Sequence, residues 1–326
     1  MKEPIRSVGL AVAAALIAVP LLAGAQSYPQ KPLRFVVPFP AGGAGDIFAR
    51  TIGQKLSDAF GQPVLVDNRP GANGIIGMEM VAKSPPDGYT IVMGVSATMV
   101  LNPSLYPKLP YDPIKDYAPV TQGTLYPYIL IVHPSIPARS IAELVALAKA
   151  HPGKLQYGSS SNGGSNHLAG EMFKRMAGVN IVHVPFKGSA PALVDTLAGQ
   201  ISMMFDTIVT TLPQLKAHKV RALAVTGTSR AAQAPDVPTM REAGYPDYEV
   251  TAWQSILAPA NTPRPIIDRL YQETVKALKM PDVIDRLATQ GGNELVGNTP
   301  GEFANVIRSE IVSYGKLIRE ANIRLE

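Results

Sequence analysis

Cysteine is absent from the 326 residues, so the chain has no disulfide bonds and must be stabilised by its packed core alone. After the first 25 residues there is no continuous apolar stretch of 18 residues, so we expect no later segment to form a transmembrane helix. Lysine and arginine are scattered, without a basic run or interleaved aromatic residues. We therefore expect a soluble mature chain that does not bind nucleic acid.

The first 25 residues have the three-part pattern of a signal peptide. Lys2 and Arg6 give the positive start, Gly9 to Leu22 form an uncharged apolar run, and residues 23–25 (Ala-Gly-Ala) match a small-x-small cleavage site. The alternative is an uncleaved membrane anchor, but the run is short for crossing ~30 Å of hydrocarbon. The pattern predicts export, cleavage before Gln26 and a periplasmic location. No cysteine follows the run, which excludes a lipoprotein.

The predicted mature chain has 326 − 25 = 301 residues, which suggests roughly two domains. The total formal charge is +5, of which the leader contributes +1 through Lys2, Arg6 and Glu3, so the mature chain keeps +4. A mildly basic protein attracts anions over long range, and an anionic solute is therefore favoured.

Short apolar runs alternate with helical patterns, which is typical of an α/β protein with largely parallel sheets. Predicted strands cover residues 34–38, 64–66, 89–95, 129–132, 155–158, 181–184, 201–205 and 222–225. Predicted helices cover residues 46–60, 73–83, 140–151, a segment from 166 onward, 264–278, 281–289 and 300–321. A loop rich in proline and tyrosine, residues 101–120, separates the first set from the second.

The first of two strand–glycine loop–helix units is PFPAGGAGD, Pro38 to Asp46. Ligands in open α/β sheets lie beyond the carboxyl ends of strands, where a helix N-terminus offers free N–H groups and a positive dipole end. Ala41, Gly42 and Gly43 would let the backbone approach a ligand carboxylate, while Asp46 caps the helix. The alternative is a glycine-rich turn that binds nothing.

The second unit is YGSSSNGGSNHLAGE, Tyr157 to Glu171. Its four serines supply hydroxyl donors, and His167 lies in the first turn of the following helix. The alternative is that the serines are ordinary caps and turn formers and that His167 is a packed surface residue. Two helix N-termini facing each other across a cleft would suit a dicarboxylate or another anion.

Motifs for catalysis, cofactors and metals are missing from both units. Gly43-Ala44-Gly45 is followed by Phe48 where a dinucleotide fingerprint has glycine, and no Gly-Lys-Ser/Thr marks a P-loop. Gly158 to Asn162 reads GSSSN, whereas a serine nucleophile elbow needs G-x-S-x-G. The five histidines contain no i, i+4 pair. We expect no cofactor and no metal, although catalysis is left open by the residues alone.

Eight ordered segments resemble the substrate-binding receptors of tripartite tricarboxylate transporters, the Bug-type receptors. The resemblance covers essentially the whole mature chain. The segments are Tyr28 to Arg50, Val64 to Thr90, Tyr111 to Val120, Tyr157 to Gly178, Ile181 to Asp206, Arg221 to Arg230, Pro235 to Val250 and Leu257 to Leu270.

The resemblance implies a two-domain periplasmic-binding-protein fold of the Venus flytrap, type II-like kind, with the ligand cleft between the domains. Domain one would comprise residues 26–126 and 252–326, and domain two residues 127–251, with the hinge where the chain crosses near Tyr126 and Thr251. In such receptors the ligand carboxylate lies between the two glycine-containing loops, often with bridging waters. The implied ligand-binding residues are Phe39, Ala41, Gly42, Gly43, Asp46, Ser96, Thr98, Ser159, Ser160, Ser165, His167 and Asp206.

The implied function is capture of a small carboxylate in the periplasm and its delivery to membrane transporter subunits, by a monomer that is not an enzyme. Candidate ligands are di- and tricarboxylates, acidic amino acids and aromatic carboxylates. One alternative is a receptor that presents its ligand to a sensor kinase, since uptake and sensing begin with the same capture step. The other is an exported esterase-type hydrolase.

Overall fold

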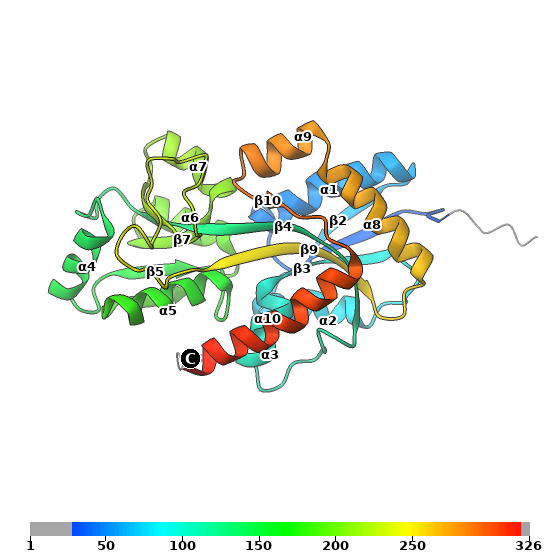
Figure 1. Cartoon of the computed structure of the whole chain (residues 1–326), viewed down its shortest axis with the longest axis horizontal. Coiled ribbons are helices and arrows are strands. Elements are labelled where there is room, and N and C mark those ends of the chain that lie inside the picture. The colour runs from blue at the N-terminus through cyan, green and yellow to red at the C-terminus, as the bar shows by residue number, and fades with distance from the viewer. Residues whose placement is uncertain (1–27, 321–326) are drawn as a thin grey trace, which may run out of the picture.

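The computed structural model describes residues 28–320, so the predicted signal peptide lies outside the described residues. Within that range the chain is an α/β protein, as predicted, but its sheet is not largely parallel: the strands next to β4 and β9 pair antiparallel. Its ten-stranded sheet has the order β2-β1-β3-β9-β4-β7-β5-β6, with β8 and β10 each paired to β4. Most helices lie in two groups at opposite ends of the long axis (Figure 1), which we call the first and the second lobe. No helix among these residues is both long and apolar enough to cross a membrane.

The first lobe combines the N-terminal third of the described chain with its C-terminal helices, and β1 pairs in parallel with both β2 and β3. Its N-terminal elements are β1 (Leu33–Val37), α1 (Ala44–Phe60), β2 (Val64–Asn68), α2 (Ile75–Ala82), β3 (Thr90–Val95) and α3 (Asn102–Leu105). Its C-terminal elements are α8 (Arg264–Leu278), α9 (Pro281–Val283), β10 (Glu294–Leu295) and α10 (Pro300–Glu320).

The second lobe is formed by the middle of the chain, and its strand β5 pairs in parallel with both β6 and β7. Its elements are α4 (Ile141–Ala150), β5 (Gln156–Ser159), α5 (Ser165–Ala177), β6 (Val182–Pro185), α6 (Ser189–Leu197), β7 (Met203–Thr207), α7 (Ile208–Lys216) and β8 (Arg221–Val225).

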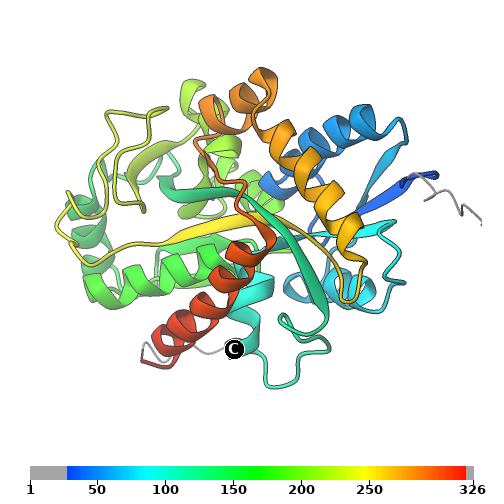
Figure 2. The ribbon, with the colours of Figure 1, turned by 45° about the vertical axis from the view of Figure 1, so that its right-hand side comes forward.

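Two long strands, β4 (Tyr117–Val132) and β9 (Thr251–Pro259), join the lobes by running antiparallel to each other across the middle of the molecule (Figures 1 and 2). Residues 117–127 of β4 pair with β9, and residues 128–132 pair with β7 and β8. β4 therefore belongs to both lobes. The predicted domain boundaries fall inside these two strands, and they stay a prediction.

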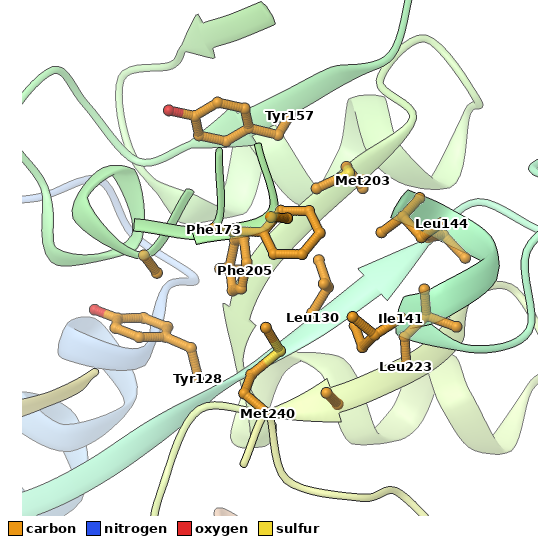
Figure 3. Packing of buried hydrophobic residues seen from close by; sticks show 14 of the residues in the cluster. Tyr128, Leu130, Ile141, Leu144, Tyr157, Phe173, Met203, Phe205, Leu223 and Met240 are labelled. Carbon is orange, nitrogen blue, oxygen red and sulfur yellow. The ribbon is translucent and has the colours of Figure 1, made fainter. Parts of the chain in front are cut away.

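Each lobe has its own hydrophobic core. In the second lobe the rings of Phe173 and Phe205 meet edge to face at 6.3 Å between centroids, with Leu130, Tyr157 and Met203 around them (Figure 3). All five side chains are fully buried. Burying an apolar side chain of this size contributes about 1.5–3 kcal/mol, so each lobe is stabilised on its own side of the molecule.

The strands predicted from the sequence were incomplete for the two segments that cross between the lobes, β4 and β9. Only residues 129–132 of β4 were predicted as strand, and β9 was not predicted at all. β4 carries Pro119 and Pro127, which lack an N–H group, and between them polar residues interrupt the apolar pattern. The strand accommodates this by irregular pairing with β9 between Pro119 and Thr124. The local sequence therefore does not mark β4 as a strand, and its pairing with the neighbouring strands defines it.

We predict that Gly170→Ala in α5 destabilises the protein. A Cβ at Gly170 would lie 2.1 Å from Cε2 of the buried Tyr157. Overpacking of this kind typically costs about 1–3 kcal/mol of unfolding free energy, which exceeds the roughly 1 kcal/mol that alanine gains over glycine in a helix. Urea unfolding followed by circular dichroism measures the change. The control is Gly301→Ala in α10, where a Cβ meets nothing within 4 Å. Equal effects of the two substitutions would contradict the packing argument.

Candidate functional site

A cavity lies between the lobes, at the carboxyl ends of β1, β3, β5 and β7. Its volume is about 650 Å³, including the solvent at its mouth. Both lobes and both crossing strands contribute to its walls. The lining residues are Phe39, Pro40, Gly43, Ala44, Gly45, Met93, Val95, Ala97, Tyr126, Tyr128, Ser160, Ser165, Asn166, Ser189, Asp206, Thr207 and Gln254.

Four helices, α1, α5, α6 and α7, begin at this cavity, and none of them has a hydrogen bond from a capping side chain at its N-terminus. The first N–H groups of a helix have no partner within the helix, and together with the dipole they give that end a positive charge of about +0.5. The cavity-lining residues at these helix starts are Gly43 to Gly45, Ser165, Asn166, Ser189 and Thr207. The cavity is therefore suited to an anion.

Charged side chains contribute little to the described walls. No lysine, arginine or histidine is among the lining residues, and the one acidic residue is Asp206. Among the described lining residues the helix starts alone supply positive potential, and Asp206 at the start of α7 offsets part of it. An anion bound here would be held by backbone N–H groups and by hydroxyls such as that of Ser165, and that of Ser160 could take part by turning its proton away from Asn166.

Asp46 supports the glycine loop from α1 and does not line the cavity. Its Oδ2 accepts hydrogen bonds from the backbone N of Gly42 (3.1 Å) and from Nε of Arg50 (2.9 Å), and its Oδ1 accepts from Nδ2 of Asn68 (3.0 Å). The same Asn68 nitrogen donates to the carbonyl oxygen of Phe39 (3.0 Å). Burial acts to raise the pKa of Asp46, but these hydrogen bonds and the Arg50 charge lower it overall. The ionised carboxylate therefore fixes the loop.

The serine loop of the second lobe is fixed in a similar way. Oγ of Ser160, which lines the cavity, donates to Oδ1 of Asn166 (2.9 Å). The fully buried Ser159 turns away from the cavity, donates to the carbonyl oxygen of Ser161 (2.9 Å) and lies 2.6 Å from Nε2 of His183. Of the predicted serines, Ser160 and Ser165 reach the cavity, and Ser159 shapes the loop.

His167 lies behind this loop and not in the cavity. Its ring stacks on that of His183 with centroids 3.9 Å apart and planes inclined by 15°, and its Nδ1 accepts a hydrogen bond from the backbone N of Gly163 (3.1 Å). Burial lowers the pKa of His167 to about 4. The pKa of His183 is lowered to about 3, mainly by burial and to a smaller extent by the neighbouring His167 and Lys174. Both rings are neutral at pH 7 and pack as part of the structure.

The remaining predicted residues occupy three kinds of position. Phe39, Gly43 and Asp206 line the cavity, whereas Ala41 and Gly42 are exposed at the glycine loop beside it. Ser96 accepts a hydrogen bond from the backbone N of Trp253 (2.9 Å), which ties the end of β3 to β9. Thr98 bonds with its Oγ1 to the backbone of Val95, so neither of these hydroxyls faces the cavity.

Sequence reasoning missed most of the cavity lining, and five of the missed residues carry polar side chains from β4, β9, α5 and α6. Tyr126 and Tyr128 come from β4 and Gln254 from β9, the strands that were incompletely predicted. Asn166 follows Ser165 in α5, and Ser189 starts α6. A signal for Ser189 was present, because β6, Gly188 and α6 form a third strand–glycine–helix unit. Asn166 lies inside the second predicted unit, but no local pattern marked Tyr126, Tyr128 or Gln254.

The two lobes touch at the rim of the cavity. The side chains of Asn73 and Ser161 are hydrogen-bonded across the gap, and the hydroxyl of Tyr106 donates to the carbonyl oxygen of Asn162 (3.3 Å). A Cβ added to Gly188 would lie 2.8 Å from the ring of Pro40. The described arrangement is therefore a closed one, in which loops of both lobes meet over the cavity.

The sequence model of the tripartite tricarboxylate transporter family receptor matches residues 48–323. The chain belongs to this receptor family. It is 41% identical over 295 residues to a UPF0065 protein from the tcbD–tcbE intergenic region of Pseudomonas sp. (strain P51), covering 90% of this chain and 87% of that protein. It is 35% identical to the protein BugT of Bordetella pertussis, covering 98% and 97%. The predicted Bug-type resemblance is confirmed.

Solved receptors of known ligand have the same fold. The chain matches R. palustris Rpa4515, solved with adipate, at a TM-score of 0.88 and 36% identity, covering 91% of this chain and 99% of that one. It matches MatC from Rhodopseudomonas palustris, solved with bound malate, at a TM-score of 0.85 and 33% identity, covering 89% and 100%. The periplasmic-binding-protein fold is thus confirmed, and the chain is a solute-binding receptor and not an enzyme.

We predict that the receptor loses stability when the stacked histidines are protonated. Because their pKa values in the folded state lie below the ordinary value of 6.5, the unfolded chain takes up protons first, and stability falls progressively from about pH 6.5 towards pH 3–4. His167→Asn combined with His183→Gln should flatten this dependence. Urea midpoints at pH 7, 6 and 5 measure it. The exposed control His151→Gln should keep the wild-type dependence of the urea midpoint on pH. The same dependence in the double variant would contradict the role of the stacked histidines.

Proposed function

We propose that this receptor captures a small carboxylate in the periplasm and delivers it to the membrane subunits of a tripartite transporter. The observation that carries the proposal is the convergence of four uncapped helix N-termini on one cavity without a cationic side chain. Such ends bind carboxylates through backbone N–H groups. The neighbours solved with adipate and with malate support this ligand class.

A periplasmic location is supported by two independent facts. Residues 1–25 have the signal-peptide pattern, and neighbours of the same family include the periplasmic binding protein BugD. We propose that the chain acts there as a monomer, since the cavity is complete within one chain. Its walls come from both lobes of the same molecule.

We also propose that the two lobes are the two domains that bind the ligand between them. The first lobe would be domain one, residues 26–126 with 252–326, and the second lobe would be domain two, residues 127–251. The chain crosses between them in β4 and β9, near Tyr126 and Thr251, and β4 changes its pairing partners after Pro127. A hinge there would turn one lobe against the other by small changes of backbone torsion along two paired strands. The ligand stabilises the closed form only if it binds that form better than the open one.

The proposed ligand contacts are the predicted residues that line the cavity, while the other predicted residues hold the loops in place. The contacts are Phe39, Gly43, Ser160, Ser165 and Asp206. The supporting residues are Ala41, Gly42, Asp46, Ser96, Thr98, Ser159 and His167. Backbone-mediated recognition of this kind explains why glycine and serine, and not arginine, dominate the two loops.

We expect a thermal-shift screen of the mature chain to identify a carboxylate ligand. A ligand at 100 times its Kd raises the unfolding free energy by about 2.7 kcal/mol, which is easily measured for a protein of this size. The panel should contain adipate, malate, citrate, glutamate, nicotinate and terephthalate, with their amides as uncharged controls. Stabilisation by carboxylates and not by amides is the expected result. Absence of stabilisation by every carboxylate would overturn the proposed function.

We predict that Ser160→Ala combined with Ser165→Ala weakens ligand affinity at least tenfold. Each hydrogen bond to a charged group contributes about 1.5–3 kcal/mol, and both serines belong to the second lobe, so ligand-induced compaction should decrease as well. Calorimetry and small-angle scattering with the best panel carboxylate measure the two effects. Ser309→Ala with Ser313→Ala, on the exposed face of α10, is the matched control. Wild-type affinity in the first variant, together with an identical radius of gyration with and without ligand, would confine the site to the first lobe.

A further inference from the structure

Asp206, at the end of β7, has one oxygen that nothing in the described chain satisfies. Its Oδ2 accepts hydrogen bonds from the hydroxyls of Thr210 (2.8 Å) and Thr211 (2.9 Å), both in the first turns of α7. Its Oδ1 is the one buried side-chain oxygen or nitrogen within residues 28–320 that has no hydrogen-bond partner. The residue is 1% exposed and lines the cavity between the lobes. A buried polar atom left unpaired destabilises a protein, so this oxygen requires an explanation.

The charge state of Asp206 decides what Oδ1 can bind. Oδ2 is occupied by two donors at the start of α7, an arrangement that favours the ionised carboxylate, while burial raises the pKa of Asp206 to about 6. The carboxyl group is therefore mostly ionised at pH 7, and Oδ1 is an acceptor without a donor.

The groups that face Asp206 do not supply that donor. Tyr126 and Tyr128 on β4 lie close enough for the charge of Asp206 to contribute to their raised pKa values, which are due first to burial, and their rings meet edge to face at 5.7 Å, but neither hydroxyl bonds to Oδ1. The cavity walls contributed by α1, α5, α6 and β9 contain no lysine, arginine or histidine in the described chain. The missing donor must therefore come from what enters the cavity.

We propose that Asp206 selects ligands that carry a hydroxyl or an ammonium group in addition to their carboxylate, with that group donating to Oδ1. The inference rests on the proposed function and deepens it: the starts of α1, α5 and α6 take the carboxylate, and Asp206 takes the donor. An ammonium group would also neutralise a buried carboxylate, whereas an unsubstituted dicarboxylate would bring a second negative charge towards it. Hydroxy acids and amino acids share the donor chemistry, and the test separates them.

The decisive experiment compares probes that differ only in the donor. Calorimetry at pH 7.5 would use succinate, malate and aspartate, then glutarate, 2-hydroxyglutarate and glutamate, then any other carboxylate found in the thermal-shift panel with its hydroxylated and aminated analogues. We expect a donor-bearing member to bind at least tenfold more tightly than its unsubstituted parent. Preference for aspartate over malate would identify the ammonium, and the reverse would identify the hydroxyl.

The matched variants separate recognition from folding. Asp206→Asn should lower the affinity ratio of the aminated probe to its unsubstituted parent at least tenfold, because the amide no longer offers a negatively charged acceptor. Thr210→Ala removes a donor to Oδ2 and leaves Oδ1 in place, so it should lower stability and keep the ligand preference. Retention of the preference in folded Asp206→Asn would show that Asp206 serves only to cap α7.

The pH dependence provides a test that needs no variant. Aspartate keeps essentially the same charge between pH 7.5 and pH 5. Its affinity for the wild-type receptor should fall as the pH drops through about 6, because Asp206 then takes up a proton and Oδ1 is no longer a free acceptor. Unsubstituted dicarboxylates that bind as tightly as their substituted analogues at pH 7.5, or aspartate that binds more tightly on acidification, would overturn the role of Asp206 alone. Failure of all carboxylates to bind would instead overturn the proposed function.

Discussion

The pairing of β4 with β9 is the constraint on which the rest of this molecule depends. Nine residue pairs, from Tyr117 with Pro259 to Pro127 with Thr251, hold the two strands antiparallel across both lobes. Everything that lines the cavity is positioned from this ribbon: β3 pairs with β9 on one side, and β7 pairs with β4 on the other. The cavity exists because loops at the ends of strands in both lobes meet over the middle of the ribbon.

Two buried aspartates show how environment determines the role of the same side chain. Asp46 accepts hydrogen bonds at both oxygens, from a backbone N–H, an arginine and an asparagine, and its lowered pKa keeps it ionised as a fixed support. Asp206 has donors at one oxygen only, and burial raises its pKa. A saturated carboxylate stabilises a loop, whereas a half-satisfied one that faces a cavity retains the capacity to recognise a ligand.

Much of this architecture could be predicted from the sequence, because strand–glycine–helix units are local signals. The patterns at Pro38 to Asp46 and at Tyr157 to Glu171 predict two loops that do contribute to the cavity wall, and the helix predicted for residues 46–60 agrees with α1 to within two residues at both ends. The long crossing strands were not recognised. Pro119 and Pro127 in β4 break the pattern that marks a strand, and what makes this segment a strand is its pairing with residues more than 100 positions away.

The difference between local signals and tertiary contacts also explains why only some of the cavity residues could be predicted from the sequence. A histidine in the first turn of a helix behind a glycine loop is expected to face the ligand, but His167 packs on His183, a residue 16 positions further along whose strand runs beside β5. Tyr126, Tyr128 and Gln254 reach the cavity only through the crossing strands. Sequence patterns show where backbone donors are, since glycine and helix starts are local. The side chains from β4 and β9 reach the cavity through tertiary contacts, so the backbone donors of the cavity are more predictable from the sequence than these side chains.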